Sequence, residues 1–126
     1  TIWPVVGFVS SSFGWRSSPF GGRGQFHKGL DITNRVGTPV VAPAQGAVTF
    51  SGHDGAYGIS VEINHGGGIT TKYGHLQRSA VQPGQWIKRG SVLGYVGNTG
   101  RTTGPHLHYE VRLNGVPVNP MRYILE

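Results

Sequence analysis

The chain has 126 residues, and its 11 lysines and arginines outnumber its 5 aspartates and glutamates, which gives a formal net charge of +6. The absence of cysteine excludes disulfides, thiolate nucleophiles and cysteine-type zinc sites, so histidine and carboxylate remain as the strong metal ligands. A positive balance favours polyanionic partners, but the basic residues are scattered without a recognition motif, so we expect no nucleic acid partner.

No apolar run approaches the length of about 18 residues that a membrane helix needs, so we expect no membrane span in this segment. No basic start followed by an apolar block marks a signal peptide. Because the chain begins at Thr1 without methionine, we expect a processed product or an excised part of a longer precursor with possible other domains. The length suits a single domain, 1–126, with its own core.

Glycine and proline divide the chain into short runs of β-branched and aromatic residues. The 22 glycines and 8 prolines leave no stretch with a clean helical period, which predicts an all-β fold of two packed sheets. The predicted strands are Val9 to Trp15, Gly29 to Thr33, Gly46 to His53, Gly58 to His65, Ile69 to His75, Val92 to Val96 and His106 to Leu113. The glycines at 66 to 68 predict a hairpin turn. The one predicted helix is a short turn near Met121 to Ile124.

His106 and His108 stand two residues apart in the last predicted strand. Strand alternation places both on one face, and their imidazoles start roughly 6 to 7 Å apart, close enough to serve one small site. The opposite, apolar face consists of Leu107, Tyr109, Val111 and Leu113. The alternative is that both histidines are merely the polar face of a half-buried strand. Glu110 shares this face and either orients an imidazole or forms a salt bridge with a neighbouring arginine.

A second pair, His27 and Asp31, is four residues apart in the stretch HKGLDI. In a straight strand the two would lie about 13 Å apart, so they share an ion only if the backbone bends, for which Gly29 is suited. A surface pair is the alternative. With one histidine of the later pair they would form a His₂Asp zinc site with an open fourth position. The remaining histidine and His75 would then be candidates for proton transfer and oxyanion stabilisation.

Three motifs occur in order: HKGLDI at 27–32, KYGHLQ at 72–77 and TGPHLHYEV at 103–111. With the intervening segments GTPVVAPAQGAVTFSG and VQPGQWIKRGSVLGYVGNTGRTTG, they closely resemble the lysostaphin-like M23 zinc metallopeptidases, also called LytM domains. The resemblance covers the chain from about Phe13 to Pro120. It implies an antiparallel β-sandwich with a groove across one sheet and little or no helix, and it implies peptides of bacterial peptidoglycan as substrates.

The same resemblance implies roles for five side chains. His27, Asp31 and His108 would ligate one zinc ion (Zn²⁺) per chain. His106 would be the general base, and His75 its partner at the transition state. All five positions are intact, so we expect a catalytic zinc endopeptidase (a peptidoglycan hydrolase) of the cell envelope, either periplasmic or secreted.

Several alternatives remain open at this point. A LytM domain can instead bind peptidoglycan or activate an amidase without catalysis, and a glucose-type phosphotransferase carrier has a related β-fold. Among peptidases, we favour a D,D-type cut over a glycyl-glycine cut, although that choice lies in groove loops such as SSPFGGRGQF and SGHDGAYG. The NTGRTTG loop with Arg101 either lines the groove or is only a connecting turn. His53 and His65 match no family motif and are expected to be structural or exposed.

Overall fold

The structure is a computed structural model that describes residues 2–17 and 24–123, and within these ranges the protein is all-β, as predicted. The strands are Phe8–Ser11 (β1), Gly14–Ser17 (β2), Gly24–His27 (β3), Leu30–Thr33 (β4), Pro39–Val41 (β5), Gly46–His53 (β6), Ile59–Gly66 (β7), Ile69–Ser79 (β8), Trp86–Ile87 (β9), Val92–Val96 (β10), His106–Leu113 (β11) and Val116–Val118 (β12). The described helices are two 3₁₀ turns of three residues, Gly55–Tyr57 (η1) and Pro120–Arg122 (η2). None of the described helices is long and apolar enough to cross a membrane.

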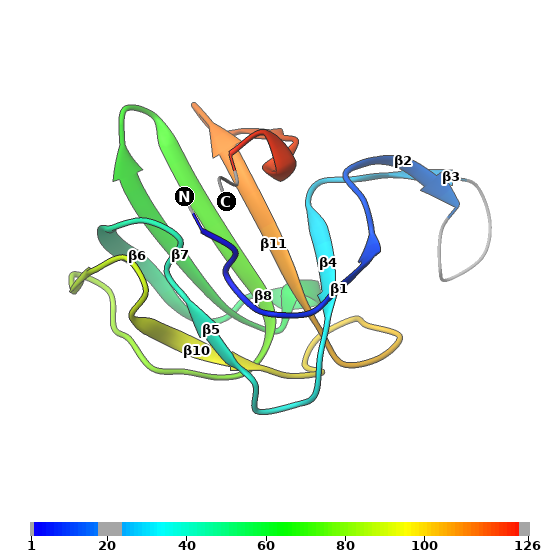
Figure 1. Ribbon diagram of the computed structural model, residues 1–126, viewed down its shortest axis with the longest axis horizontal. Coiled ribbons are helices and arrows are strands. Elements are labelled where there is room, and N and C mark those ends of the chain that lie inside the picture. The colour runs from blue at the N-terminus through cyan, green and yellow to red at the C-terminus, as the bar shows by residue number, and fades with distance from the viewer. Residues whose placement is uncertain (1, 18–23, 124–126) are drawn as a thin grey trace.

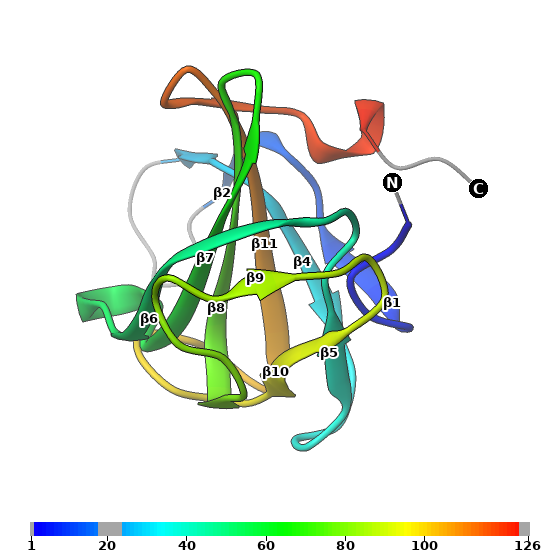
Figure 2. The same cartoon turned by 90° about the vertical axis from the view of Figure 1, so that its left-hand side faces the viewer.

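Among the described residues, every strand pairing is antiparallel. The main sheet has the order β1-β4-β11-β8-β7-β6-β9, with β12 beside β11 (Figure 1). β10 pairs with both β8 and β5, so β10 and β5 extend the same sheet into a second layer. Figure 2 shows β5, β9 and β10 in front of β4 and β11. The two predicted layers are therefore present, but they belong to one continuous sheet.

The core fills the space between these layers. Leu30 and Ile32 of β4 and Leu107 of β11 belong to the same buried cluster as Val40 of β5 and Leu93 of β10. Burial of this apolar surface is the main force that holds the two layers together.

The alternation predicted for β11 is confirmed over most of its length. Leu107, Tyr109 and Val111 are almost completely buried, but Leu113 is 38% exposed. Leu113 is the last residue of β11, where the core no longer covers it.

Other sequence predictions were only approximate. The predicted strand from Val9 to Trp15 is two strands, β1 and β2, which pair with different partners. β3, β5, β9 and β12 were missed. β12 had a readable signal, because Asn114 and Gly115 both have positive φ in the tight turn that joins it to β11. The predicted helix near Met121 is the turn η2, and its predicted end at Ile124 lies outside the described residues.

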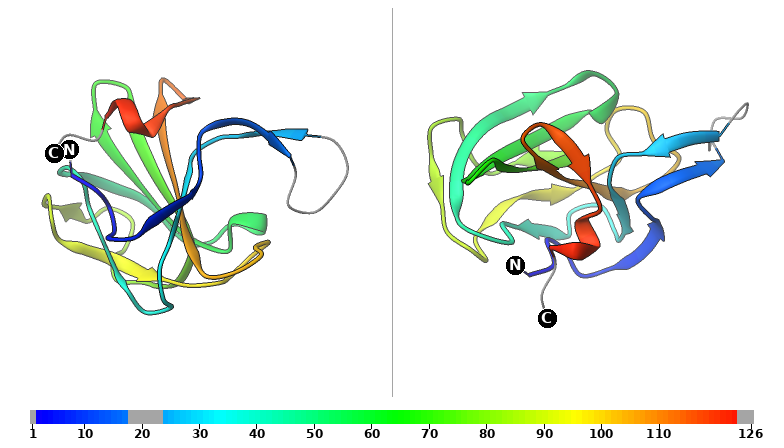
Figure 3. Two further views of the ribbon diagram at one scale, coloured as in Figure 1. Left: turned by 45° about the vertical axis from the view of Figure 1, so that its right-hand side comes forward. Right: turned by 90° about the horizontal axis from the view of Figure 1, so that it is seen from above.

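β2 and β3 form a separate two-stranded ribbon that projects from the main sheet (Figures 1 and 3). Its register pairs Trp15 with Phe26, and the rings of Phe13 and Trp15 each meet Phe26 edge to face. The ribbon ends at His27, whose ring contacts Asp31 near the start of β4. This ribbon therefore positions one of the predicted metal ligands.

Candidate metal centre

An open groove of about 620 Å³ lies over the polar face of β4 and β11. Its walls come from β1, β3, η1 and the loop between β10 and β11. The NTGRTTG loop lines it through Arg101, Thr102 and Thr103, and η1 in SGHDGAYG lines it through Ala56 and Tyr57. Of the stretch SSPFGGRGQF, residues 18–23 lie outside the described part of the chain, whereas Gln25 and Phe26 line the groove.

The structure brings His27, Asp31 and His108 together at the bottom of this groove. His108 of β11 lies opposite Asp31 of β4 in the register of the two strands. Asp31 Oδ1 is 3.2 Å from His27 Nε2 and 2.9 Å from His108 Nδ1. All three potential ligand atoms lie within 4.8 Å of one another, and all three residues are buried. The bend predicted at Gly29 is therefore present.

Both imidazoles of this cluster are held in the tautomer that a metal requires. His27 Nδ1 donates to the Ser12 carbonyl at 2.9 Å, which leaves the Nε2 lone pair facing Asp31. His108 Nε2 donates to Glu110 Oε2 at 2.7 Å, which leaves the Nδ1 lone pair facing the same oxygen. A ligand nitrogen is commonly oriented in this way by a partner on the other ring nitrogen.

The electrostatics favour the ionised form of Asp31. Burial by itself would raise the pKa of its carboxyl, but the side chains of His108 and His27 beside it outweigh burial and hold this pKa well below its usual range. Two nitrogen donors and one carboxylate in a buried cluster are a donor set that fits a divalent metal and leaves a further position open to the groove. These three residues are the candidate metal site.

His75 and His106 lie side by side next to this cluster and also line the groove. Their ring centroids are 4.8 Å apart, and His106 Nε2 is 3.5 Å from Asp31 Oδ1. His75 Nδ1 donates to the Thr99 carbonyl at 2.7 Å, and His106 Nδ1 donates to the Gly104 carbonyl at 2.8 Å. Both rings are therefore fixed through Nδ1.

A backbone irregularity turns His75 toward the groove. Its φ of 60° is left-handed, which is uncommon for a residue with a side chain. The register of β7 and β8 slips here, since Val61 lies opposite Tyr73 and Ile59 opposite Leu76. Tyr73 and Leu76 are both in the core, so simple alternation is interrupted between them. The resulting bulge re-aims His75, which regular alternation from Tyr73 would have placed on the core face.

Glu110 combines the two roles that the sequence left open. One carboxylate oxygen accepts from His108, as described, and the other accepts from Arg112 Nε and a terminal Arg112 nitrogen at 2.9 and 2.6 Å. The Tyr57 hydroxyl donates to Glu110 Oε2 at 2.7 Å. Sequence analysis missed Tyr57, because no spacing relates it to a residue that is 53 positions away.

The groove thus contains both the His-Asp-His cluster and the paired histidines His75 and His106. Residues 25–120 match Peptidase family M23. The chain belongs to this family.

Curated M23 relatives match over most of this chain. It is 47% identical over 117 residues to the DD-carboxypeptidase/endopeptidase Mpg of Neisseria meningitidis, which is 93% of this chain and 27% of that protein. It is 44% identical over 113 residues to the peptidoglycan DD-endopeptidase ShyC of Vibrio cholerae, which is 89% of this chain and 26% of that protein. The chain thus spans about a quarter of the length of these relatives.

A solved structure supports the M23 fold. A zinc-containing peptidase from Vibrio cholerae superposes with a TM-score of 0.88 and is 36% identical, over 94% of this chain and 38% of that one. The family, which the three motifs predicted, is thereby confirmed.

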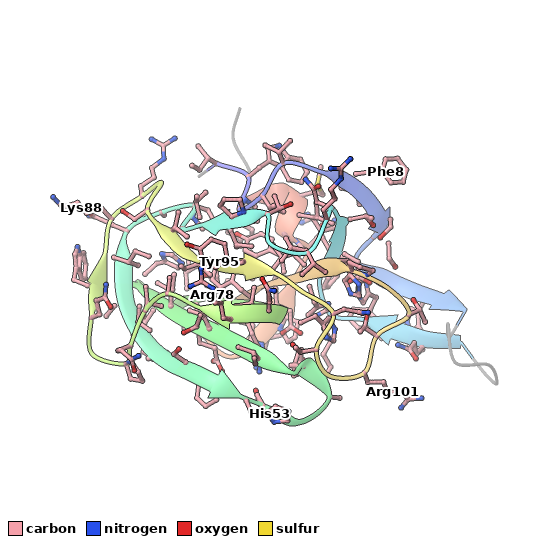
Figure 4. All side chains as sticks on the ribbon, turned by 90° about the horizontal axis from the view of Figure 1, so that it is seen from below. Phe8, His53, Arg78, Lys88, Tyr95 and Arg101 are labelled. Atoms are coloured by element: carbon pink, nitrogen blue, oxygen red, sulfur yellow. The ribbon has the colours of Figure 1, made fainter. Side chains whose placement is uncertain are left out.

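The two histidines outside the M23 motifs take no part in this site. His53 is exposed and points away from the molecule in Figure 4. His65 is half-buried on the other side of the sheet, where Nδ1 bonds the Gln45 carbonyl and Nε2 bonds Thr71 Oγ1, at 2.8 and 2.7 Å. The prediction that both are structural or exposed is confirmed.

Proposed function

We propose that this M23 domain is a zinc endopeptidase that hydrolyses peptide bonds of bacterial peptidoglycan. The observation that carries the proposal is the meeting of His27, Asp31 and His108 at the bottom of an open groove that also contains His75 and His106. A purely structural metal site would be closed by a fourth protein ligand, whereas this one faces the groove.

We assign one zinc ion per chain to His27, Asp31 and His108. When bound, zinc supplies Lewis acidity toward the scissile carbonyl and the attacking water. Asp31 contributes a carboxylate that stays ionised, and the two histidines contribute lone pairs already oriented by Ser12 and Glu110. Little reorganisation is needed to receive the ion, which favours tight binding.

His106 accepts a proton from the attacking water, as the general base. Its Nδ1–H is held by the Gly104 carbonyl, so its Nε2 lone pair faces the cluster, 3.5 Å from Asp31 Oδ1. This is the geometry that a base needs in order to reach a proton next to the metal ligands.

His75 assists at the transition state. Burial lowers the pKa of its imidazole to about 4, so the ring is neutral at physiological pH. Because Nδ1–H is committed to Thr99, the Nε2 of neutral His75 is an acceptor. His75 therefore enters the reaction as an acceptor that can hold one proton of the attacking water in a hydrogen bond while His106 takes the other.

The substrate that we propose is the directly cross-linked stem peptide, cut in a D,D manner. Both named relatives, Mpg and ShyC, are DD enzymes. Two cationic residues, Lys28 and Arg101, line the groove, and Figure 4 shows Arg101 extending from the loop before β11. Stem peptides carry carboxylates that such residues attract, whereas a glycine bridge carries none. The place of action would be the cell envelope.

The test is to incubate the chain with purified sacculi that are either directly cross-linked or joined by glycine bridges, and to identify the released termini by mass spectrometry. We expect release from the directly cross-linked wall, and none with Asp31→Ala. Cleavage only between glycines would overturn the substrate assignment. Zinc binding without release from any wall would favour the non-catalytic, amidase-activating alternative.

A further inference from the structure

The groove wall at η1 is joined to the metal cluster through a chain of polar contacts. Tyr57 lines the groove and donates its hydroxyl to Glu110 Oε2, at 2.7 Å. The same oxygen accepts from His108 Nε2, also at 2.7 Å. Glu110 is fully buried, so solvent competes little for its carboxylate oxygens.

Two residues of β8, Gly74 and Lys72, lie against the Tyr57 ring. Gly74 lies opposite His108, and a Cβ atom at Gly74 would come within 3.3 Å of Tyr57 Cδ1 and 3.6 Å of His108 Cβ. The missing side chain thus makes room for the tyrosine, whose ring centroid is 5.5 Å from that of His108. The ammonium of buried Lys72, two residues earlier on the same face of β8, lies 3.8 Å from the Tyr57 centroid.

Lys72 also fixes the segment that carries Tyr57. Its ammonium forms a salt bridge with Asp54 at 2.5 Å, directly before η1, and lies 3.6 Å from Glu62 of β7. Within η1, the Ala56 carbonyl accepts a hydrogen bond from the Arg101 amide at 2.8 Å. Tyr57 is therefore held from several directions in the one position that reaches Glu110.

We propose that Tyr57, seated on Lys72 and Gly74, is a positioning residue that acts through Glu110 to orient His108 for the metal. The inference rests on the proposed function only in taking His108 as a zinc ligand. Without the Tyr57 hydroxyl, Glu110 Oε2 is held by His108 alone, so the carboxylate can rotate toward Arg112, which already holds the other oxygen. The His108 ring then loses the acceptor that keeps Nδ1 directed at Asp31.

The test measures zinc affinity by competition with a chromophoric chelator, so it does not depend on hydrolysis. Loss of a partner of a metal-ligating histidine typically weakens binding about 10- to 100-fold, which we expect for Glu110→Gln. For Tyr57→Phe, one residue further out, we expect a loss of roughly three- to tenfold in the same direction. In the Glu110→Gln background, adding Tyr57→Phe should have no further effect, because the route through Glu110 is already lost.

Tyr95→Phe is the matched control. Tyr95 on β10 also lies beside a cation, with the Arg78 guanidinium 4.1 Å from its ring centroid, but it does not line the groove, and Figure 4 shows it away from Arg101. Its zinc affinity should equal that of the wild type. Thermal unfolding of the metal-free variants separates a positioning role from a structural one, since Tyr57→Phe should leave the midpoint close to that of the wild type.

Three outcomes would overturn the inference. They are unchanged zinc affinity in Tyr57→Phe, additive effects in the double variant, and a weakening that merely follows a fall in the unfolding midpoint. If the wild type itself binds no zinc, the proposed function fails as well, so the two failures are distinguishable.

Discussion

The side chains of His106 and His108 lie on the same face of β11, yet their rings contact different partners. His108 is buried between Asp31 and Glu110, whereas the Nδ1 of His106 is held by Gly104 and its Nε2 faces the groove. Alternation within the strand could place both side chains but could not separate their roles. The separation depends on which backbone carbonyl or carboxylate each ring meets.

This difference predicts distinct losses for two alanine variants. His108→Ala should lose zinc on dialysis, because one of three ligands is gone. His106→Ala should retain about one zinc per chain yet lose about 10²- to 10⁴-fold in the rate of release from sacculi, the usual size of a general-base contribution. Metal analysis and release assays on the same samples check both. His53→Ala, at an exposed histidine outside the groove, should change neither. Zinc loss in His106→Ala would contradict the division of roles.

The burial of His65 predicts that the stability of the folded protein depends on pH, independently of catalysis. Burial lowers the pKa of its imidazole in the folded state. The unfolded chain therefore binds a proton at His65 more readily, and stability falls as the pH drops below about 6.5, the ordinary histidine value. Between about pH 8 and pH 5, the urea midpoint of the metal-free wild type should fall more than that of His65→Gln. An equal fall in both proteins would exclude a contribution from His65.

At the scale of elements, the sequence predicts what alternation and turn residues encode locally. β6, β10 and β11 were predicted with their observed bounds, because each is an apolar-alternating run between glycines or prolines. β3 and β9, of four and two residues, are too short to show a period, and they form strands only through their pairing partners. The bulge at His75 was not predictable, because it depends on register across β7 and β8.

Gly29 lies between β3 and β4, where the segment that joins His27 to Asp31 packs closely against β11. A Cβ atom there would lie 2.2 Å from the Tyr109 carbonyl oxygen and 3.0 Å from Glu110 Cγ. Gly29→Ala must push β4 away from β11, which should cost about 1 to 3 kcal/mol of stability and weaken zinc binding. Urea unfolding and chelator competition measure the two effects. At Gly104 a Cβ would meet nothing within 4 Å, so Gly104→Ala is the control. If Gly29→Ala is as stable as the wild type, the backbone at Gly29 can move away from β11 without loss of stability.

At the scale of the whole molecule, the candidate site joins residues from distant parts of the chain. His27, Asp31 and one histidine of the later pair were proposed from sequence because so few histidines and acids exist that their combinations can be enumerated, and the resemblance to M23 peptidases then selected His108. Tyr57 and Lys72 were not, because tyrosine and lysine have many ordinary surface roles and only the folded register places them beside Glu110. Ligand chemistry is therefore readable from composition and motif, whereas the residues that support the ligands require the fold.

The net charge of +6 belongs to the whole surface, and it predicts how the domain associates with an anionic wall. Lys88 lies far from Arg101 and the groove (Figure 4), and it is followed by Arg89. Changing both to glutamate lowers the formal net charge by four without touching the groove. Because screening shortens electrostatic attraction from about 14 Å to about 4 Å between roughly 0.05 and 0.5 M salt, sedimentation with sacculi should weaken over that range.

At low salt, the double variant Lys88→Glu, Arg89→Glu should lose most of the binding to sacculi that the sedimentation assay measures. Its cleavage of a small, soluble cross-linked peptide should stay at the wild-type rate, because such a peptide contacts the groove alone. Carrying Asp31→Ala in the sedimentation samples prevents digestion of the wall during the measurement. Retention that is independent of both salt and these two residues would mean that groove contacts, and not the surface charge, hold the domain on the wall.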